Sequence, residues 1–520
     1  MERISALLLT DLRFLIADLG KDGGLMGPSI YDTAQVLRLA PPEEGADAGL
    51  EWLLAQQRAD GGWGIPNVPL ARTVPTLAAV LTVAAYLGRA HPAVQRGLRF
   101  LAEQEALWTD PLPDDLPAGV ELLAPHLLDE AAALGLAIPA TYAPLRALGH
   151  RRRALLAQIG PRPGTTIAHS WEGWGTTAGT ELLDPAGSLG LSPAATAAWL
   201  RAARGRADLR AEQQAAQRYL RRAASVTGAG VPGVVPTVWP IARFEQAFAL
   251  YMLLIAGLLD HPALRDVVAP QVADMERAMR PEGLGFSDWF APDGDDTAAA
   301  CAVFAALGLP THLDALRRFA SGDRFCTWHG ELQPAPSVTS HALHALRLAG
   351  GERRESVAYL LGQQRPDGRW LGDKWNRSWV YTTGQALIAL SGQAPQASIE
   401  RGVAALLVGQ RPSGAWGEPH PTGEETAYAV LALCALQREG QLPAGALPAL
   451  ERAAAWLARP ERAPDGEDVI YWLAKEPYRP QRVARICELA ATALAWETLR
   501  RNDRYTIATV SHLATAPDVA

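Results

Sequence analysis

The chain has 520 residues, of which 48% are apolar and 20% are charged, and its formal net charge is −7. This length predicts two or three domains, or one large core in two parts. The negative charge argues against a general nucleic-acid-binding protein, and four cysteines that lie far apart, without a CxxC pair or metal-ligand spacing, indicate a reduced cytoplasmic protein.

Residues 1–20 predict an amphipathic helix and no secretion signal, because Asp11, Arg13 and Asp18 interrupt the apolar run. The longest uninterrupted apolar stretch, residues 247–259, is too short to cross a bilayer and predicts a buried helix. We therefore expect a soluble protein without a transmembrane segment.

A Gln-Arg-x-x-Gly-x-Trp pattern occurs three times, at residues 57–63, 364–370 and 410–416, and each copy follows and precedes an apolar helical stretch. The spacing of the last two copies suits stacked helix pairs joined by a tight glycine turn. The glutamine can bond free backbone groups at a neighbouring helix end, while the tryptophan packs across the turn. The sequence therefore predicts an all-α fold arranged as double-layered barrels.

Three carboxylates in four positions, Asp293, Asp295 and Asp296, follow a proline-containing turn and precede an alanine-rich run. This predicts a helix entrance, where the helix dipole and free amides favour anions. Crowded carboxylates do not all ionise easily, so one of them tends to keep its proton with a raised pKa. Such a group could act as a strong Brønsted acid; the plainer alternatives are an N-capping acidic turn and a calcium-ligand cluster.

The Gln/Trp repeats and the Asp-x-Asp-Asp motif together resemble those of the class II terpene cyclases. Further segments, in the same order along the chain, resemble the bacterial class II diterpene cyclases related to copalyl diphosphate synthases, and this resemblance covers nearly the whole chain. The matching segments are residues 28–34, 169–173, 187–197, 373–375, 424–428 and 474–478.

The resemblance implies two α/α-barrel domains. A β-type barrel would comprise residues 1–20 plus 255–520 and carry the acid motif, and a γ-type barrel would be inserted as residues 21–254. We expect the active site between them, since pockets often lie at domain interfaces. The chain has neither an Asp-Asp-x-x-Asp motif nor residues enough for a class I α domain, so the product should keep its diphosphate.

The implied reaction is protonation-initiated cyclisation of geranylgeranyl diphosphate to a bicyclic labdane-, halimane- or clerodane-type diphosphate. By match to the family motif Asp295 is the acid, while Asp293 and Asp296 position it and tune its proton. The family often places an Asn after a Ser-Val-Thr stretch to hydrogen-bond the acid. Here residues 337–340 are followed by His341, which could serve instead or could be a histidine satisfied within a helix face.

Carbocations need π faces and protection from water. Four aromatic residues close to the matched motifs are candidates for the cavity wall, although plain core packing is the alternative for each: Trp239, Trp289, Trp328 and Tyr381.

The diphosphate needs counter-charge, which family members supply partly as Mg²⁺. Glu172 matches the carboxylate placed near that ion, and one carboxylate suffices because Mg²⁺ also takes phosphate oxygens and water. Lys374, Arg377 and, more weakly, Lys475 are the candidate diphosphate-binding side chains. The alternative for each is an exposed, salt-bridged side chain.

Two candidates for the terminating deprotonation follow from the resemblance to plant ent-copalyl synthases. His169 matches the histidine of their Leu-His-Ser stretch, and Thr237 stands where they have the asparagine of Pro-Asn-Val. Because Thr replaces Asn, a rearranged halimadienyl, kolavenyl or terpentedienyl skeleton is as plausible as the ent-copalyl one.

Other functions stay open at this point. The substrate could be farnesyl diphosphate, giving drimenyl diphosphate, or the chain could be a squalene-hopene-type triterpene cyclase. A prenyltransferase β-subunit would need an Asp/Cys/His zinc set, for which no match is seen, and a non-enzymatic α/α-barrel binding protein would not need the intact acid motif. The expected partners are a class I terpene synthase that uses the product and a second copy in a homodimer.

Overall fold

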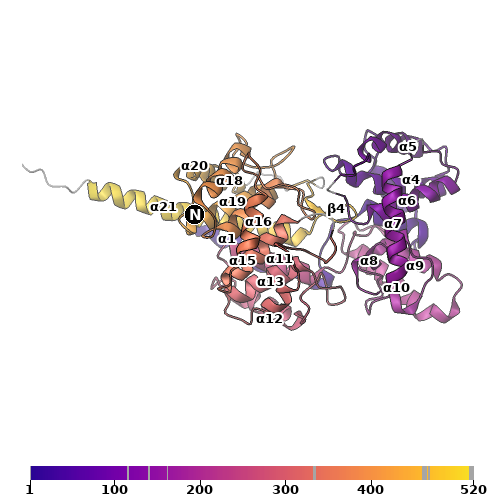
Figure 1. Cartoon of the computed structure of the whole chain (residues 1–520), viewed down its shortest axis with the longest axis horizontal. Coiled ribbons are helices and arrows are strands. Elements are labelled where there is room, and N and C mark those ends of the chain that lie inside the picture. The colour runs from indigo at the N-terminus through magenta and orange to yellow at the C-terminus, as the bar shows by residue number, and fades with distance from the viewer. Residues whose placement is uncertain are drawn as a thin grey trace, which may run out of the picture.

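The computed structural model describes residues 2–113, 116–138, 141–160, 162–331, 335–459, 465–466 and 469–513, with side chains described between residues 7 and 498. It is built almost entirely of helices. They form two rings, which are the two lobes seen in Figure 1.

The large ring has six inner helices, each in contact with the next, and contacts between α11 and α21 close it. Each inner helix also carries one outer helix. The inner helices are α11 (Ala242–Ile255), α13 (Gly294–Ala306), α15 (Pro336–Leu348), α17 (Trp379–Leu390), α19 (Gly423–Arg438) and α21 (Gln481–Leu513). The outer helices are α12 (Arg265–Ala278), α14 (Leu313–Arg317), α16 (Arg354–Gly362), α18 (Gln396–Gly409), α20 (Leu447–Leu457) and α1 (Glu2–Ala17).

The small ring is closed in the same way by contacts of α2 with α4, α4 with α6, α6 with η4, η4 with α9, and α9 with α2. These inner elements are α2 (Ile30–Leu39), α4 (Thr73–Leu87), α6 (Val120–Ala133), the 3-10 turn η4 (Trp171–Gly173) and α9 (Pro193–Ala202). The outer helices are α3 (Asp47–Ala55), α5 (Pro92–Gln104), α7 (Ala143–Ile159) and α10 (Arg210–Ser225). The remaining short pieces are α8 (Thr166–His169) and the 3-10 turns η1 (Lys21–Gly23), η2 (Pro69–Arg72), η3 (Glu105–Leu107), η5 (Thr180–Leu182), η6 (Ala207–Leu209) and η7 (Ala444–Ala446).

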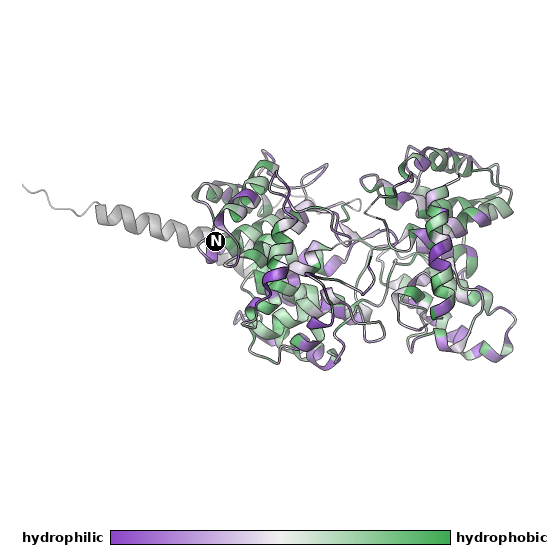
Figure 2. Cartoon of the chain, in the orientation of Figure 1, coloured by the Kyte–Doolittle hydropathy of each residue, from purple (hydrophilic) through white to green (hydrophobic). Residues whose placement is uncertain are grey.

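The sequence of the inner helices explains their place. Helices α13, α15, α17 and α19 are buried around their whole circumference, because each has a neighbour on either side and an outer helix behind it. Helices α13 and α19 are rich in alanine, which has a high helix propensity and lets helices approach closely. Figure 2 shows the apolar colour concentrated inside each lobe and the polar colour on its outer helices and loops.

Two short antiparallel hairpins are the only strands among the described residues: β1 (Ala320–Ser321) with β2 (Arg324–Phe325), and β3 (Trp472–Leu473) with β4 (Pro477–Tyr478). The β3–β4 hairpin extends from the large ring towards the small ring (Figure 1). There the amide of Ala118 donates to the carbonyl of Ala474 at 3.0 Å. We call this boundary between the two rings the seam.

The first Gln/Trp repeat closes a turn between two outer helices. The Gln57 amide donates to the Gly61 carbonyl at 2.8 Å and to the Ala93 carbonyl, in the first turn of α5, at 2.9 Å. The Trp63 indole donates to the Leu53 carbonyl, near the end of α3, at 2.8 Å. The repeat therefore ties the end of one helix to the start of the next.

The copies at residues 364–370 and 410–416 make the same three hydrogen bonds, at 2.7–3.1 Å. The turn glycine is required at each copy, because Gly61, Gly368 and Gly414 have φ of 89°, 89° and 94°. A Cβ there would also lie 2.2–2.7 Å from a carbonyl oxygen of the next outer helix. The structure confirms the predicted pairing of helices through these turns.

Helix α11 differs from the predicted domain limits. The expected boundary at residue 254 assigns nearly all of α11 to the inserted barrel, yet α11 packs against α12, α13 and α21 of the large ring. Its buried apolar side chains belong to the large-ring core. A boundary before residue 242 therefore describes the packing better, because a chain segment belongs to the core that buries it.

One helical stretch, Pro69–Leu87, has the length and apolar composition to cross a bilayer, and 78% of its window is buried inside the protein. Such burial is what a core helix requires, and α4 is an inner helix of the small ring.

Candidate active site

The acid motif lies at the start of α13, as predicted. The Asp293 side chain is the N-cap: its Oδ1 accepts the amide hydrogens of Asp295 at 3.0 Å and Asp296 at 2.8 Å. The predicted capping role is therefore real and coexists with any catalytic one. Three carboxylates are held within one helical turn, close to the amides that favour negative charge.

Two of the three carboxyl groups are held in a state that resists ionisation. Burial, as the largest cause, raises the pKa of Asp293 to about 8 and raises the pKa of Asp296 well above its usual range. The contact between the two carboxyls raises the pKa of Asp296 and lowers that of Asp293, as expected if protonated Asp296 donates to Asp293. No amide, hydroxyl or cation of the described chain donates to either oxygen of Asp296.

Asp295 is the member of the motif that remains accessible. It is 7% exposed, whereas Asp293 and Asp296 are 1% exposed. Its Oδ1 lies 2.5 Å from Nδ1 of His341, which is fully buried on α15. The Tyr381 hydroxyl on α17 lies 3.2 Å from the other ring nitrogen, Nε2. The structure thus places His341 at the acid, the position that sequence reasoning left open.

A continuous series of aromatic ring contacts runs from His341 to Trp375 along the large ring. Every step joins ring centroids 5.0–6.3 Å apart. In order, the series is His341, Phe248, Trp472, Phe244, Phe286, Phe290, Trp328 and Trp375. Trp375 follows Lys374 in the chain, so the series connects the acid with a predicted diphosphate-binding lysine.

The predicted cavity aromatics divide into two pairs. Trp328 belongs to the series, and Tyr381 contacts both His341 and Trp472. Trp239 is instead buried in a separate core cluster of the small ring, where its ring centroid lies 5.6 Å from that of Tyr219, and it shows no contact with the acid. Trp289 is 46% exposed, and this exposure argues against a place in the wall of a closed cavity.

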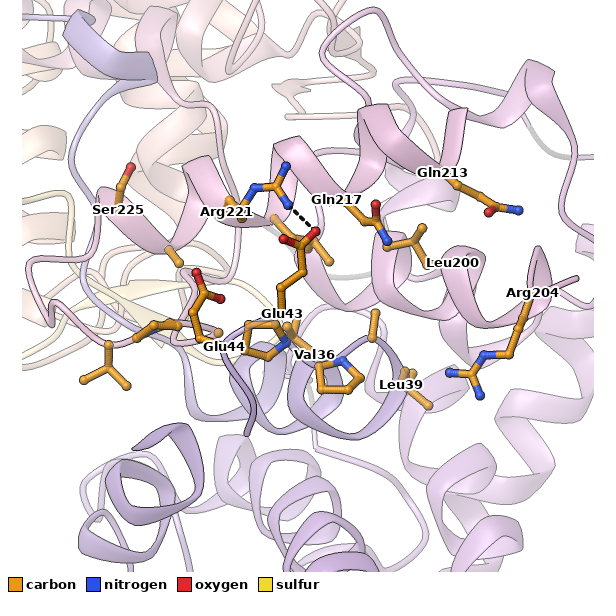
Figure 3. A pocket seen from close by; sticks show the side chains of 18 of the residues that line it. Val36, Leu39, Glu43, Glu44, Leu200, Arg204, Gln213, Gln217, Arg221 and Ser225 are labelled. Atoms are coloured by element: carbon orange, nitrogen blue, oxygen red, sulfur yellow. Dashed lines mark hydrogen bonds and ion pairs between the residues drawn. The ribbon is translucent and has the colours of Figure 1, made fainter. Parts of the chain in front are cut away.

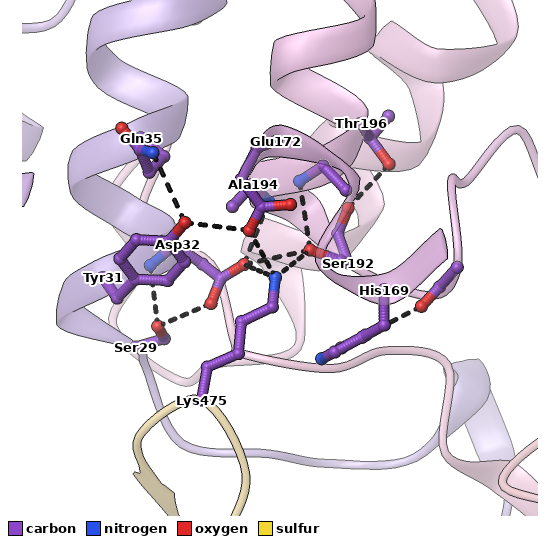
Figure 4. A network of polar contacts seen from close by, with 12 residues as sticks. Ser29, Tyr31, Asp32, Gln35, His169, Glu172, Ser192, Ala194, Thr196 and Lys475 are labelled. Atoms are coloured by element: carbon purple, nitrogen blue, oxygen red, sulfur yellow. Dashed lines mark hydrogen bonds and ion pairs between the residues drawn. The ribbon is translucent and has the colours of Figure 1, made fainter. Parts of the chain in front are cut away.

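Glu172 and Lys475 meet across the seam (Figure 4). The Lys475 ammonium lies 2.7 Å from Glu172 Oε1 and 2.6 Å from Ser192 Oγ, and the Tyr31 hydroxyl donates to the same Glu172 oxygen at 2.8 Å. The Lys475 side chain is fully buried. Lys475 is thus paired with a carboxylate and buried, and its binding of the diphosphate stays a prediction.

Two further carboxylates lie beside Glu172 and Lys475, and each accepts a hydrogen bond from an amide at the start of a helix. Asp32 accepts the Ala194 amide at the start of α9 at 2.9 Å, and Glu476 accepts the Tyr31 amide at the start of α2 at 3.3 Å. Burial raises the pKa of Asp32 to about 6 and that of Glu476 to about 8. We call Asp32, Glu172, Lys475 and Glu476 the seam cluster, and Asp293, Asp295 and Asp296 with His341 the acid cluster.

Lys374 and Arg377 line a pocket of about 470 Å³ at the seam, together with residues 67–71 and 116–117 of the small ring. The Arg377 Nε donates to the Ile470 carbonyl at 2.7 Å, which fixes the guanidinium at the pocket wall. The two predicted diphosphate-binding cations therefore face one space.

Helix α7 brings a further cation to this region. Burial lowers the pKa of Lys374, and the charges of Glu331 and Glu121 act against that lowering while Arg152 on α7 adds to it. Arg152 Nε is 3.9 Å from Glu121 Oε1. Sequence reasoning missed Arg152 and Glu121, and the run of three arginines at residues 151–153 was the available signal.

Glu172 retains one oxygen that fits a magnesium ion. Its Oε2 is buried and accepts no hydrogen bond from the described chain. No three His, Cys, Asp or Glu side chains of the described residues form a metal-holding group by themselves. A single carboxylate oxygen is still compatible with Mg²⁺, which typically keeps waters and takes substrate phosphate oxygens.

His169 and Thr237, the predicted termination residues, approach the same turn. His169 Nδ1 lies 2.8 Å from the Gly190 carbonyl oxygen. The amide of Trp239, two residues after Thr237, donates to the carbonyl of Leu191, the residue after Gly190, at 3.0 Å. Burial, with the charge of Lys475, lowers the pKa of His169 to about 3, so its ring is neutral. The Thr237 hydroxyl is buried without a partner in the described chain.

A larger groove of about 720 Å³ lies elsewhere on the small ring, between α2 and α10 (Figure 3). The Arg221–Glu43 ion pair, 3.0 Å long, spans it. None of the predicted site residues lines this groove. Its size alone therefore does not make it the active site.

Several known proteins are similar to this chain. Residues 325–439 match the family model of the squalene-hopene cyclase C-terminal domain. The chain is 46% identical to a (+)-kolavenyl diphosphate synthase from Herpetosiphon aurantiacus, across 94% of this chain and 98% of that one. It is 33% identical to an ent-copalyl diphosphate synthase from a Streptomyces species, across 92% and 94% of the two chains.

A solved structure shows the same architecture. The ent-copalyl diphosphate synthase from Streptomyces platensis superposes with a TM-score of 0.78 at 30% identity, covering 94% of this chain and 99% of that one. The similarity therefore extends over both rings of helices. On this evidence the chain belongs to the bacterial class II diterpene cyclases, enzymes of the terpenoid cyclase α/α-barrel fold.

Proposed function

We propose that this enzyme cyclises geranylgeranyl diphosphate to a bicyclic diphosphate and keeps the diphosphate on the product. The observation that carries the proposal is the accessible Asp295 carboxyl, 2.5 Å from His341, at one end of the aromatic series. The 46% identical kolavenyl diphosphate synthase favours a rearranged, clerodane-type skeleton within the labdane, halimane and clerodane group.

The acid cluster supplies the proton. The Tyr381 hydroxyl donates to His341 Nε2, and the Nδ1–H of the neutral ring donates to Asp295 Oδ1, which leaves the carboxyl proton of Asp295 free to move. This proton passes to the terminal alkene, whose π electrons form the new C–H bond. The His341 hydrogen bond becomes stronger when the carboxyl turns into a carboxylate, so proton loss becomes more favourable.

The aromatic series protects the cations that follow. Each internal double bond attacks the cation before it, so positive charge moves along the chain while C–C bonds form. Phe248 contacts His341 of the acid cluster, and Trp472 and Phe244 follow it in the series, close to where the first cations would arise. Their π systems stabilise positive charge without offering a nucleophile that would trap it.

We propose the 470 Å³ seam pocket for the diphosphate, with Lys374, Arg377 and Arg152 as its cations. Lys374 and Arg377 line the pocket, and Arg152 lies within electrostatic range of Lys374. Mg²⁺ would be held by Glu172 Oε2 or by Glu121 together with phosphate oxygens. When bound it would neutralise diphosphate charge.

We propose that His169 removes the final proton. The Gly190 carbonyl fixes Nδ1 as the protonated ring nitrogen, which leaves the lone pair on Nε2 as the acceptor. The unpartnered Thr237 hydroxyl near the same turn offers a hydrogen-bond site for an intervening water. The two residues would thereby select which hydrogen is lost.

The test uses purified enzyme with Mg²⁺ and, separately, geranylgeranyl and farnesyl diphosphate, followed by phosphatase treatment and mass spectrometry. A cyclic C20 alcohol that appears only after phosphatase treatment, and is lost in Asp295→Asn, supports the proposal. A cyclic C15 alcohol would replace it with a drimenyl-type reaction, and linear alcohols from both would refute it.

A retained diphosphate implies a partner reaction. Because this chain keeps the leaving group, a class I terpene synthase that ionises allylic diphosphates must use the product. We propose that both enzymes act in the cytoplasm, where prenyl diphosphates are made available and the four buried cysteines stay reduced.

A further inference from the structure

Helix α7 and the residues that flank it carry a concentration of positive charge without any acidic residue. Residues 142–164 contain five arginines and no acidic residue, in a chain whose net charge is −7. The helix is an outer element of the small ring and packs on α6. Figure 2 shows it on the outside of its lobe, with a polar middle and apolar ends.

The inward face of α7 is fully used. Leu145 and Gly149 are buried against α6, and a Cβ on Gly149 would lie 2.2 Å from the Glu121 carbonyl oxygen. Arg146 pairs with Asp129 at 2.6 Å, and Arg153 donates to the Leu122 carbonyl at 3.3 Å. These contacts explain how the helix is held and account for its inward-facing arginines.

The outward face has a different character. Arg151, Leu155 and Ile159 follow one another at four-residue spacing and so form one stripe. Leu155 is 50% exposed and Ile159 is 55% exposed. In the described part of the chain Arg151 makes no ion pair. A cationic side chain therefore continues into two large apolar ones on a face that no other element covers.

The segment that follows α7 is bonded to the large ring at the seam. Five residues after Ile159, the Gly164 carbonyl accepts the amide of Ala291 at 2.6 Å. This bond holds the segment beside Trp289, whose side chain is 46% exposed. Exposed Leu and Ile beside an arginine on one helix, with an exposed tryptophan beside the segment that follows it, are the residue types found at membrane interfaces.

We propose that the outward face of α7 and Trp289 dock on the surface of a bilayer that contains anionic lipids. Arginines suit phosphate headgroups, and the apolar stripe would enter the headgroup–acyl boundary. The absence of acidic residues from segment 142–164 favours a negatively charged partner in a protein that is otherwise acidic. Docking there would set the seam, with Lys374 facing Arg152, beside the layer in which a prenyl chain dissolves.

The test is sedimentation of the full-length protein with sucrose-loaded vesicles, in the absence of substrate, so that it does not depend on the proposed reaction. The vesicles contain phosphatidylcholine alone or with a quarter of phosphatidylglycerol. We expect binding to the anionic vesicles to fall about fivefold in Arg151→Glu and at least about tenfold in Leu155→Ser/Ile159→Ser. Turnover on dispersed substrate should not change in these variants.

Matched controls lie on the opposite lobe. Val408→Ser removes an apolar side chain that is 81% exposed, and Arg354→Glu reverses a side chain that is 92% exposed. Both controls should bind vesicles like the wild type. The proposal is overturned if the wild type binds neither vesicle, if the controls weaken binding equally, or if Leu155→Ser/Ile159→Ser instead abolishes self-association seen without lipid.

Discussion

The acid cluster and the seam cluster each bury three carboxyl groups, and they differ in what lies beside them. In the acid cluster the only neighbouring ionisable base within salt-bridge distance among the described residues is His341, 2.5 Å from Asp295. In the seam cluster the Lys475 ammonium lies 2.7 Å from Glu172 and 3.9 Å from Asp32. Burial alone therefore does not determine the chemistry of a carboxyl group.

The difference shows how one molecule separates an acid from a structural contact. Without a cation, Asp293 and Asp296 resist ionisation, and Asp295 beside them is the more exposed group that we propose as the acid. With an ammonium and helix amides, the buried carboxyls of the seam cluster accept hydrogen bonds and join two chain segments 303 residues apart. Each cluster should respond differently to the removal of one member.

Asp295→Asn should give the largest effect. The amide keeps the size of the side chain but has no carboxyl proton, so cyclisation should fall by about 10³-fold. Product alcohols are measured by mass spectrometry after phosphatase treatment, and thermal unfolding serves as the folding control. If cyclisation survives while the fold is intact, the acid cluster does not supply the proton.

Lys475→Met should damage stability more than any single change in the acid cluster. It leaves Glu172 and Asp32 buried without their cation, which should cost about 3–5 kcal/mol of unfolding free energy. Urea unfolding measures this loss. The double variant Glu172→Gln/Lys475→Met removes both charges and should recover much of it; a double variant as unstable as the single one would contradict an ion-pair role.

The pH dependence of stability should separate the clusters. The native pKa of Asp293, about 8, lies above its ordinary value, so its stability contribution is complete below the ordinary carboxyl pKa and is lost as the pH rises towards 8. Asp293→Asn keeps a good N-cap and removes this titration. The unfolding free energy of this variant should fall less steeply with rising pH than that of the wild type. The two slopes should differ by up to about 1.4 kcal/mol per pH unit.

Asp32→Asn provides the comparison in the seam cluster. The pKa of Asp32 is raised only to about 6. Its contribution to stability should therefore be lost about two pH units below the pH at which the contribution of Asp293 is lost. Urea unfolding of both variants and the wild type between about pH 5 and 8.5 makes the measurement. Identical slopes in all three proteins would show that neither carboxyl titrates as proposed.

Tyr381→Phe should have the smallest effect. It removes the hydroxyl 3.2 Å from His341 Nε2 but leaves the ring, so turnover should fall about two- to tenfold. Tyr251→Phe is the matched control, because its hydroxyl lies 2.9 Å from His344 instead. Equal losses in both variants would mean that the hydroxyls support the core rather than the acid.

Sequence reasoning located the features that depend on neighbouring residues. The start of α13 was predictable, because an N-cap acts within three residues and Asp293 precedes an alanine-rich run. The helix-pairing turns were predictable for the same reason, since Gln57 and Gly61 lie in one short segment. Local chemistry repeats visibly in a sequence.

The features that depend on distant residues were less accessible. Lys475 was expected at the diphosphate, but its partner Glu172 comes from the other ring, and no local pattern reveals that pairing. Trp472 belongs to the aromatic series because the β3–β4 hairpin brings it against Phe248 and Phe244 of α11. Trp289, predicted to be enclosed, is half-exposed because its turn lies at the edge of the seam.

The position of α1 has a consequence for the order in which this protein is assembled on the ribosome. Helix α1 packs against α12 and α21. The first helix to be synthesised therefore cannot complete its packing until α21, near the end of the chain, has been made. The contacts that close the small ring all lie between α2 and α9, and that ring can form while α21 is still absent. The nascent chain can therefore hold a finished inserted ring while the large ring, which needs α21 for its closure, is still open.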